Sequence, residues 1–354
     1  MLNPKPDHMQ QESFRIFNHP HPFPLESGEV LPGFHLAYHL HGELNARKDN
    51  VVWVFHALTA NSDPTAWWPG LVGSGKLIDP QEYFIICVNM PGSCYGSVGP
   101  LDTNPADGLP YLHRFPLFTI RDMVRAYQLL RAALGLGRIR IGIGGSMGGQ
   151  QLLQWAVLEP TLFDYIIPIA TNAQHSPWGK AFNESQRWCI EADPTWIDAS
   201  PTAGMEGMKI ARSIALLSYR QYETYSFQQS DGGAASYQRY QGEKLALRFN
   251  AFSYYQLSRS MDSHCLGTDG LSVAEALQRI EAKALVIGLY SDLLFPIAEQ
   301  RFLAAGIPGG SWAAIETVYG HDGFLIEYEA IAGKIEEFFA GNLIGFNRSV
   351  PTFS

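Results

Sequence analysis

The sequence is poor in cysteine and in charge, and it has no long apolar run. Four of its 354 residues are cysteine, and none belongs to a CxxC pair or to a zinc-type cluster with histidine. An uncharged run of eighteen residues, Ile141–Leu158, contains five glycines and three glutamines, which argues against a membrane span. We therefore expect reduced thiols, no metal site and no membrane segment.

The first residues, MLNPKPDHMQQESF, lack the apolar segment of a secretion signal, so we expect a cytoplasmic protein. Only 17% of the residues are charged, and 25 Lys and Arg stand against 34 Asp and Glu, a net charge of −9. No basic cluster interrupts this acidic balance, so nucleic acid is not an expected partner. An anionic substrate would have to meet a few placed cations instead.

Apolar residues make up 46% of the chain, enough for a large globular core without disulfides. Short runs rich in β-branched residues predict strands buried on both faces of a parallel sheet. These runs are Val51–Phe55, Tyr83–Val88, Arg138–Ile143, Tyr165–Ile169, Ala284–Leu289 and Trp312–Val318. Phe14–Phe17 and Phe34–His41 also predict strands, and the second alternates enough to be antiparallel and half-exposed.

Helical segments separate these runs. Thr119–Leu134 has apolar residues at three- and four-residue steps, with Thr119 as an N-cap and Asp122 three residues later. The same spacing recurs from Phe324 to Phe338. Strands that alternate with helices indicate an α/β fold with a parallel sheet.

One long stretch breaks the alternation. Residues 173–282 contain no convincing buried strand, but they include the helical pieces Met205–Tyr219 and Leu245–Met261 and a glycine-rich loop, Gln228–Ser236. We interpret them as a helical insertion in a core made of residues 1–172 and 283–354.

Ser146 is the candidate nucleophile. It lies in Gly144–Gly148, which matches the pattern G-x-S-x-G between a predicted strand and an apolar helix, Gln150–Leu158. Such a strand–turn–helix presents a serine at the carboxyl edge of the sheet. A glycine-rich turn that only packs is the alternative, and a phosphate loop is excluded because the Gly-Lys-Ser/Thr sequence is absent.

Asp292 and His321 are the candidate acid and base. Asp292 follows the strand that ends near Leu289, and His321 follows the strand that ends near Val318. The order Ser, Asp, His is typical of α/β-hydrolase triads, and all three positions lie at one edge of the sheet. Each of the two would otherwise be an ordinary turn residue.

An oxyanion hole requires backbone N–H donors. We expect one from Met147, the residue after the nucleophile, and a second from Leu58 in the loop His56–Thr59 after the strand Val51–Phe55.

Beyond the triad and the oxyanion loop, short stretches spread over some 270 residues match the sequence pattern of one enzyme family. They are His56–Thr59, Gly70–Gly73, Cys94–Ser97 with Gly99–Pro100, Thr119–Val124, Gly144–Gly149, His175–Ser176, Ala181–Glu184, Ser218–Arg220, Arg248–Ala251, Ser253–Tyr254, Ser291–Asp292, Leu294–Pro296, Gly320–Asp322 and Phe324–Leu325. In these stretches the chain resembles the homoserine O-acetyltransferase family of α/β-hydrolase-fold acyltransferases. The resemblance implies a mostly parallel eight-stranded sheet flanked by helices, with the insertion as a lid over a tunnel.

The resemblance also implies a reaction, in methionine biosynthesis. An acetyl group passes from acetyl-CoA, a co-substrate, to the serine and then to the hydroxyl of L-homoserine, without a cofactor or a metal. The family pattern places the homoserine carboxylate at Arg212 and Tyr219 and the amino group at Asp322. It further implies a homodimer formed through the lid helices.

Several alternatives remain open at this point. Relatives with this signature differ in the donor, acetyl-CoA or succinyl-CoA, and in the acceptor, homoserine or serine. An esterase would pass the acyl group to water, and a binding module would have lost part of the triad, which is intact here. Three positions depart from the common family residues: Ser93, Gln150 and Asn250.

Overall fold

The computed structural model describes residues 13–228 and 232–341. Its main sheet has eight strands in the order β1-β4-β6-β5-β7-β8-β9-β10. The strands are β1 Phe14–His19, β4 Phe34–His41, β5 Val51–Phe55, β6 Phe84–Val88, β7 Ile139–Gly145, β8 Phe163–Ile169, β9 Lys283–Leu289 and β10 Gly310–Ile315. A two-stranded sheet pairs β2 Phe23–Pro24 with β3 Val30–Leu31. From β6 to β10 every pairing is parallel, whereas β4 is antiparallel to both β1 and β6. The predicted α/β class and the antiparallel strand Phe34–His41 are confirmed.

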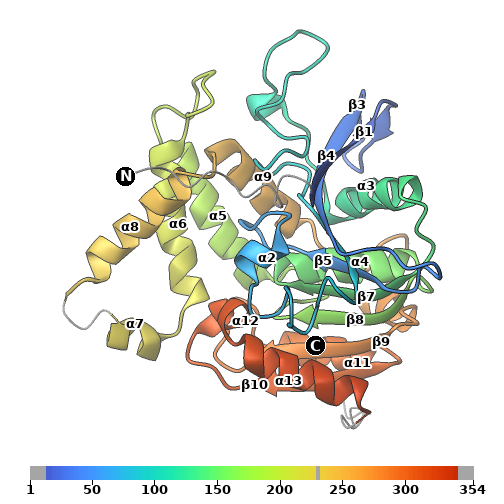
Figure 1. The fold of residues 1–354 in the computed structure, drawn as a ribbon. Helices are drawn as coiled ribbons and strands as arrows, with labels where there is room; N and C mark the ends of the chain where they lie inside the picture. Colours follow the sequence, from blue (N-terminus) through green and yellow to red (C-terminus); the bar gives the residue numbers. More distant parts are fainter. Residues whose placement is uncertain (1–12, 229–231, 342–354) are drawn as a thin grey trace, which may run out of the picture.

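Helices cover both faces of the sheet (Figure 1). They are α2 Pro64–Trp67, α3 Ile120–Ala133, α4 Met147–Leu158, α5 Pro177–Glu191, α6 Met205–Tyr219, α7 Tyr222–Gln228, α8 Ala234–Ala246, α9 Ala251–Asp262, α10 Val273–Gln278, α11 Ile297–Gly306, α12 Gly323–Ile326 and α13 Tyr328–Phe339, with the 3₁₀ turns η1 Leu112–Arg114 and η2 Gly320–Asp322. No helix among the described residues is both long enough and apolar enough to cross a membrane.

Alternation along the central strands builds two apolar layers. On β5, Trp53 packs in the cluster that includes α3, α4 and α11. Its neighbour Val54 packs in the cluster that includes α13, on the other face of the sheet. The sheet is therefore buried on both sides, as the continuous apolar runs predict.

The predicted start of α3 is confirmed in detail. Thr119 accepts a hydrogen bond from the N–H of Asp122, and the Asp122 carboxylate accepts one from the N–H of Thr119. This reciprocal pair satisfies two N–H groups that the first turn leaves unpaired.

Two helix predictions and one loop prediction are wrong in part. The predicted helix Leu245–Met261 is two helices, because α8 ends at Ala246 and the side chain of Asn250 caps the start of α9 by accepting from the N–H of Ser253. The C-terminal helix is likewise interrupted, at Glu327. Of the predicted loop Gln228–Ser236, residue 228 ends α7, residues 234–236 begin α8, and 229–231 lie outside the described residues.

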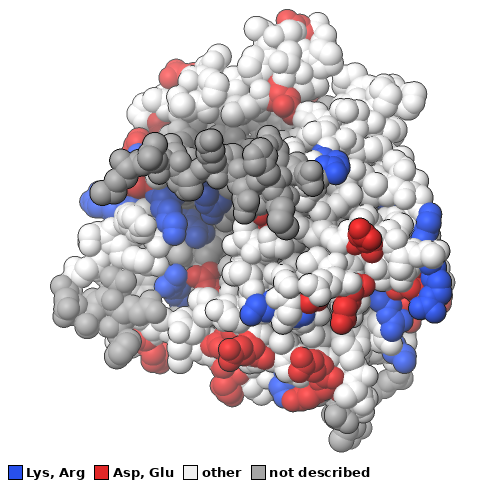
Figure 2. All heavy atoms as spheres, viewed as in Figure 1, with Lys and Arg blue, Asp and Glu red and all other residues white. Residues whose placement is uncertain are grey.

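Between β8 and β9 the described residues form α5 to α10, and α5, α6, α7 and α8 stand beside the sheet (Figure 1). On the face shown in Figure 2, one group of Lys and Arg lies beside a hollow over the insertion helices and another lies at the right-hand edge, whereas Asp and Glu are scattered over the face, with several along the lower edge. An acidic chain thus keeps a local group of cations on this face.

Candidate active site

Ser146 occupies the turn between β7 and α4 in a backbone conformation that L-residues rarely adopt, with φ 58° and ψ −128°. The turn is possible because its neighbours lack side chains. A Cβ on Gly148 would lie 2.2 Å from the carbonyl oxygen of Phe55, and one on Gly144 would lie 2.7 Å from the backbone of Gly148. The hydroxyl group is therefore held at the end of β7 by local strain that the flanking glycines permit.

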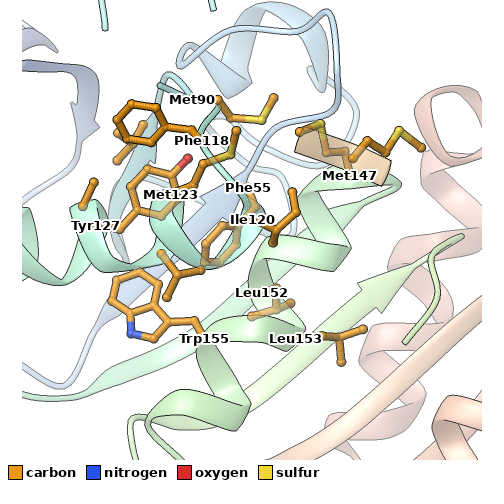
Figure 3. Close-up of a cluster of buried hydrophobic side chains, with 14 of the residues drawn as sticks. Phe55, Met90, Phe118, Ile120, Met123, Tyr127, Met147, Leu152, Leu153 and Trp155 are labelled. Atoms are coloured by element: carbon orange, nitrogen blue, oxygen red, sulfur yellow. The ribbon is translucent and has the colours of Figure 1, made fainter. Parts of the chain in front are cut away.

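Helix α4 is fixed by the core beneath it. Figure 3 shows Leu152 and Trp155 of α4 beside Phe55 of the sheet and Tyr127 of α3. The Trp155 ring lies 6.1 Å from that of Phe55 and 6.2 Å from that of Tyr127, and the Tyr127 hydroxyl donates to Gln151. This packing sets the direction from which Ser146 faces the site.

Ser146, His321 and Asp292 form one hydrogen-bonded chain. The Nε2 atom of His321 lies 2.9 Å from the Ser146 hydroxyl oxygen, and Nδ1 lies 2.7 Å from an Asp292 carboxylate oxygen. The other Asp292 oxygen accepts from the N–H groups of Leu294 and Phe295, at 2.8 and 2.9 Å. All three triad residues are at least 95% buried. Asp292 therefore orients the imidazole, which is placed to accept the serine proton.

Aromatic rings enclose the imidazole of His321. The ring centroids of Phe295, Phe324 and Tyr219 lie 5.1, 5.2 and 5.7 Å from it. Phe295 and Phe324 belong to the core, whereas Tyr219 is the last residue of α6 in the insertion. The insertion thus reaches the base directly.

The two expected oxyanion donors lie on adjoining segments. Met147 is the first residue of α4, and Leu58 lies in the turn after β5. The close approach of Gly148 to the Phe55 and His56 carbonyls brings these segments together. Among the described residues, neither N–H has a hydrogen-bond acceptor.

His56, which the sequence analysis named only as the first residue of this loop, has a structural role. It is fully buried, and loss of solvation lowers its pKa to about 4, so the ring is neutral. Its Nε2 accepts from the N–H of Met90 at 3.1 Å, so Nδ1 carries the proton and donates to the Ala57 carbonyl at 2.9 Å. The ring pins the loop that carries Leu58.

The three expected acceptor-binding residues gather at the junction of insertion and core. Arg212 and Tyr219 lie on one side of α6, and the Arg212 guanidinium carbon is 5.4 Å from the centre of the Tyr219 ring. Burial raises the pKa of Tyr219, so its hydroxyl stays protonated. Asp322 follows His321 on η2, but its carboxylate is paired with Arg220, whose Nε lies 3.2 Å from Oδ2.

Sequence reasoning therefore missed Arg220. It stood only as the last residue of one family-like stretch, and no spacing relates it to Asp322, which is 102 residues away. Tyr254 was missed in the same way. It is fully buried, its hydroxyl donates to Gln186, and burial raises its pKa, with the neighbouring charge of Arg212 acting in the opposite direction.

Gln150, one of the departures from the family pattern, belongs to a buried polar cluster. Its side-chain nitrogen lies 3.0 Å from the Asn172 amide oxygen and 3.3 Å from Nδ1 of His175. Asn172 in turn donates to Glu299 at 2.9 Å. Glu299 also receives a hydrogen bond from Ser176, which caps α5, and its burial raises its pKa to about 7. The cluster joins α4, the insertion and α11.

No group of three or more His, Cys, Asp or Glu residues in the described part of the chain is arranged to hold a metal ion. The arrangement as it stands contains parts suited to acyl transfer: an oriented serine–histidine–aspartate chain and two backbone N–H groups on the adjoining segments.

A family model described as alpha/beta hydrolase fold matches residues 50–328. The chain is 47% identical to the homoserine O-acetyltransferase of Cyclobacterium marinum over 325 residues, which cover 90% of this chain and 93% of that one. It is 40% identical to the enzyme of that name from Trichormus variabilis, over 92% and 94% of the two chains.

Solved structures agree. The homoserine O-acetyltransferase of Staphylococcus aureus has a TM-score of 0.80 and 30% identity, covering 95% of this chain and 97% of that chain. The structure of esterase E22 has a TM-score of 0.84 at 22% identity, over 92% and 99% of the chains, which shows the shared fold alone. The chain belongs to the homoserine O-acetyltransferase family, within the α/β-hydrolase fold.

Proposed function

We propose that this chain is a homoserine O-acetyltransferase of methionine biosynthesis, which moves an acetyl group from acetyl-CoA to the hydroxyl of L-homoserine. The observation that carries the proposal is the continuous Ser146–His321–Asp292 hydrogen-bond chain in a protein 47% identical to a relative of that name.

The first half-reaction acylates the serine. Ser146 attacks the thioester carbonyl carbon while its proton passes to Nε2 of His321. The N–H groups of Met147 and Leu58 stabilise the oxyanion. The carbon–sulfur bond then breaks, the proton passes from His321 to the departing thiolate, and acetyl-Ser146 and free CoA remain.

The second half-reaction runs through the same groups in reverse. His321 takes the proton from the homoserine hydroxyl, whose oxygen attacks the acetyl-serine carbonyl, and returns it to Ser146 as O-acetylhomoserine leaves. Asp292 stabilises the imidazolium in both halves by its hydrogen bond to Nδ1.

Homoserine is a zwitterion, so its site needs one cation and one anion. We place its carboxylate at Arg212 and the Tyr219 hydroxyl, and its ammonium at Asp322. The cations beside the hollow in Figure 2 suit the phosphates of an incoming CoA, because an acidic chain must attract that anion locally.

We further propose that residues 173–282 act as a lid on the core formed by residues 1–172 and 283–354, and that lid helices form a homodimer in the cytoplasm. Ile210 and Leu217 lie on one face of α6 and are 55% and 56% exposed, and Trp188 on α5 is 71% exposed. Clustered exposed apolar residues are typical of an interface. Light scattering should give a dimer for the wild type and a monomer for Leu217→Asp, and a monomeric wild type would contradict the proposal.

A CoA-release assay with thiol detection tests the function. Acetyl-CoA and succinyl-CoA are each offered alone, with homoserine and with serine. Release from acetyl-CoA that requires homoserine supports the proposal. Release with succinyl-CoA or with serine would reassign the donor or the acceptor, and release without any acceptor would indicate an esterase.

A further inference from the structure

The end of α6 lies directly on the turn that carries His321 and Asp322. Gly320 in this turn has φ 62°, and a Cβ there would lie 2.8 Å from the Tyr219 carbonyl oxygen and 3.1 Å from the Cα of Arg220. Below this contact the hydroxyl of Thr224 donates to the Val318 carbonyl. The insertion is therefore anchored to this turn by backbone contacts as well as by side chains.

Arg220 stands at this junction as the first residue after α6, in an extended conformation. Its guanidinium lies 5.5 Å from the centre of the Tyr237 ring on α8, which supports it from the side of the insertion. Its Nε reaches Oδ2 of Asp322 at 3.2 Å, and the side chains of both partners are more than 80% buried.

Only one Asp322 oxygen is used in this pair. Among the described residues, no group donates to the other oxygen, Oδ1. The turn that carries Asp322 also meets Tyr219, because Gly320 approaches the Tyr219 carbonyl oxygen, and the Asp322 charge helps to raise the pKa of the Tyr219 hydroxyl. A carboxylate with one oxygen held by a buried guanidinium is fixed in orientation and can present its second oxygen to another cation.

We propose that Arg220 is a positioning residue for the acceptor: it holds Asp322 so that the free oxygen receives the ammonium group of the substrate. The inference rests on the proposed function and adds a specificity element to it, since preference for an amino-bearing acceptor is then set by an ion pair between insertion and core. Arg220 also offsets part of the Asp322 charge, which by itself would weaken ammonium binding. We expect positioning to outweigh that effect, because an Asp322 without its partner would be a mostly buried carboxylate with no counter-ion.

The test compares wild type with Arg220→Gln and Arg220→Lys. Arg131→Gln is the matched control, because Arg131 also forms a mostly buried ion pair, with Glu159 at 2.9 Å, on α3. Three quantities are measured: kcat and KM with homoserine, the same constants with 4-hydroxybutanoate, which is homoserine without its amino group, and the burst of p-nitrophenolate released from p-nitrophenyl acetate when the serine is acylated. Melting temperatures report on folding.

Arg220→Gln should raise the KM for homoserine about tenfold or more and leave the acylation burst within about twofold of wild type. Its constants for 4-hydroxybutanoate should change little, so the preference for homoserine falls by about the same factor. Arg220→Lys should recover part of the homoserine KM, and Arg131→Gln should match wild type.

An unchanged or lower homoserine KM in Arg220→Gln overturns the inference. It is also overturned if kcat/KM falls equally with both acceptors, or if the acylation burst disappears, because either result would give Arg220 a general structural role. If Arg220→Gln does not fold, the same criteria are applied to Arg220→Lys, using the ratio of its kcat/KM for homoserine to that for 4-hydroxybutanoate. A wild type that acylates but never uses homoserine would overturn the proposed function, and this inference with it. A wild type that uses homoserine leaves the variants to decide the inference alone.

Discussion

In the proposed site, the sheet core and the helical insertion contribute in different ways. The core supplies Ser146, Asp292 and His321 from the ends of three strands, β7, β9 and β10. The insertion supplies Arg212 and Tyr219 from one helix, α6. Strand ends in a parallel sheet meet at one edge whatever the loops do, whereas the position of a lid helix depends on tertiary contacts. The core half should thus govern whether acyl transfer occurs, and the insertion half which acceptor is used.

The largest effect is expected at the nucleophile. Ser146→Ala should lower acetyl transfer by at least about 10⁴-fold, because no other group can carry the acetyl. Its melting temperature should stay near that of wild type, since among the described residues the Ser146 hydroxyl makes its hydrogen bond to His321 alone and alanine leaves the backbone turn unchanged. Ser260→Ala, another buried serine, should keep full activity. Acetyl transfer by Ser146→Ala at a near-native rate would show that the core does not supply the nucleophile through Ser146.

The second effect tests the geometry that presents the serine. Gly148→Ala should destabilise the protein by about 2–4 kcal/mol and lower activity, because the new Cβ would meet the Phe55 carbonyl oxygen at 2.2 Å. Urea unfolding measures the first effect and the CoA assay the second.

Gly333→Ala on α13 is the control for Gly148→Ala. Nothing lies within 4 Å of a Cβ at that position, so it should stabilise the helix by about 0.5–1 kcal/mol and leave activity unchanged. Equal stability in the two variants would mean that the turn tolerates a side chain.

Arg212→Ala addresses the insertion half. It should raise the homoserine KM about 10- to 100-fold and the acetyl-CoA KM far less, because only the acceptor carboxylate loses its cation. Steady-state kinetics with each substrate varied in turn measures both constants. Equal increases would assign Arg212 a structural role, through its contact with Tyr219.

The same contrast explains what the sequence could and could not predict. The strands around Ser146, the cap at Thr119 and the three strand-end residues all follow from local patterns and from the order of elements. The pairing of Arg220 with Asp322 joins residues 102 positions apart and depends on how α6 meets η2, which no periodicity encodes. The division of the predicted helix Leu245–Met261 could not be predicted either, because an asparagine such as Asn250 is compatible with both the interior of a polar helix and an N-cap position.

The smallest predicted effect concerns the cluster that ties the two halves together. Glu299 on α11 accepts hydrogen bonds from Asn172 and from Ser176, the cap of α5, and its pKa is raised from 4.5 to about 7. A carboxyl group with a raised pKa binds its proton more tightly in the folded state than in the unfolded state. Stability therefore falls as the pH rises from about 4.5 to 7, and the loss remains above that range.

Glu299→Gln keeps an oxygen that can accept from Asn172 but removes the titration. We expect it to gain about 1 kcal/mol relative to wild type at pH 8 compared with pH 4.5, measured by urea unfolding at both values, a figure reduced for partial exposure. Glu316→Gln, at an exposed position, should show no such difference. If Glu299→Gln has the same pH dependence as wild type, the carboxyl group is ionised without penalty. The contact between α5 and the core would then be no weaker at neutral pH than in acid, and the insertion could not be loosened through this residue.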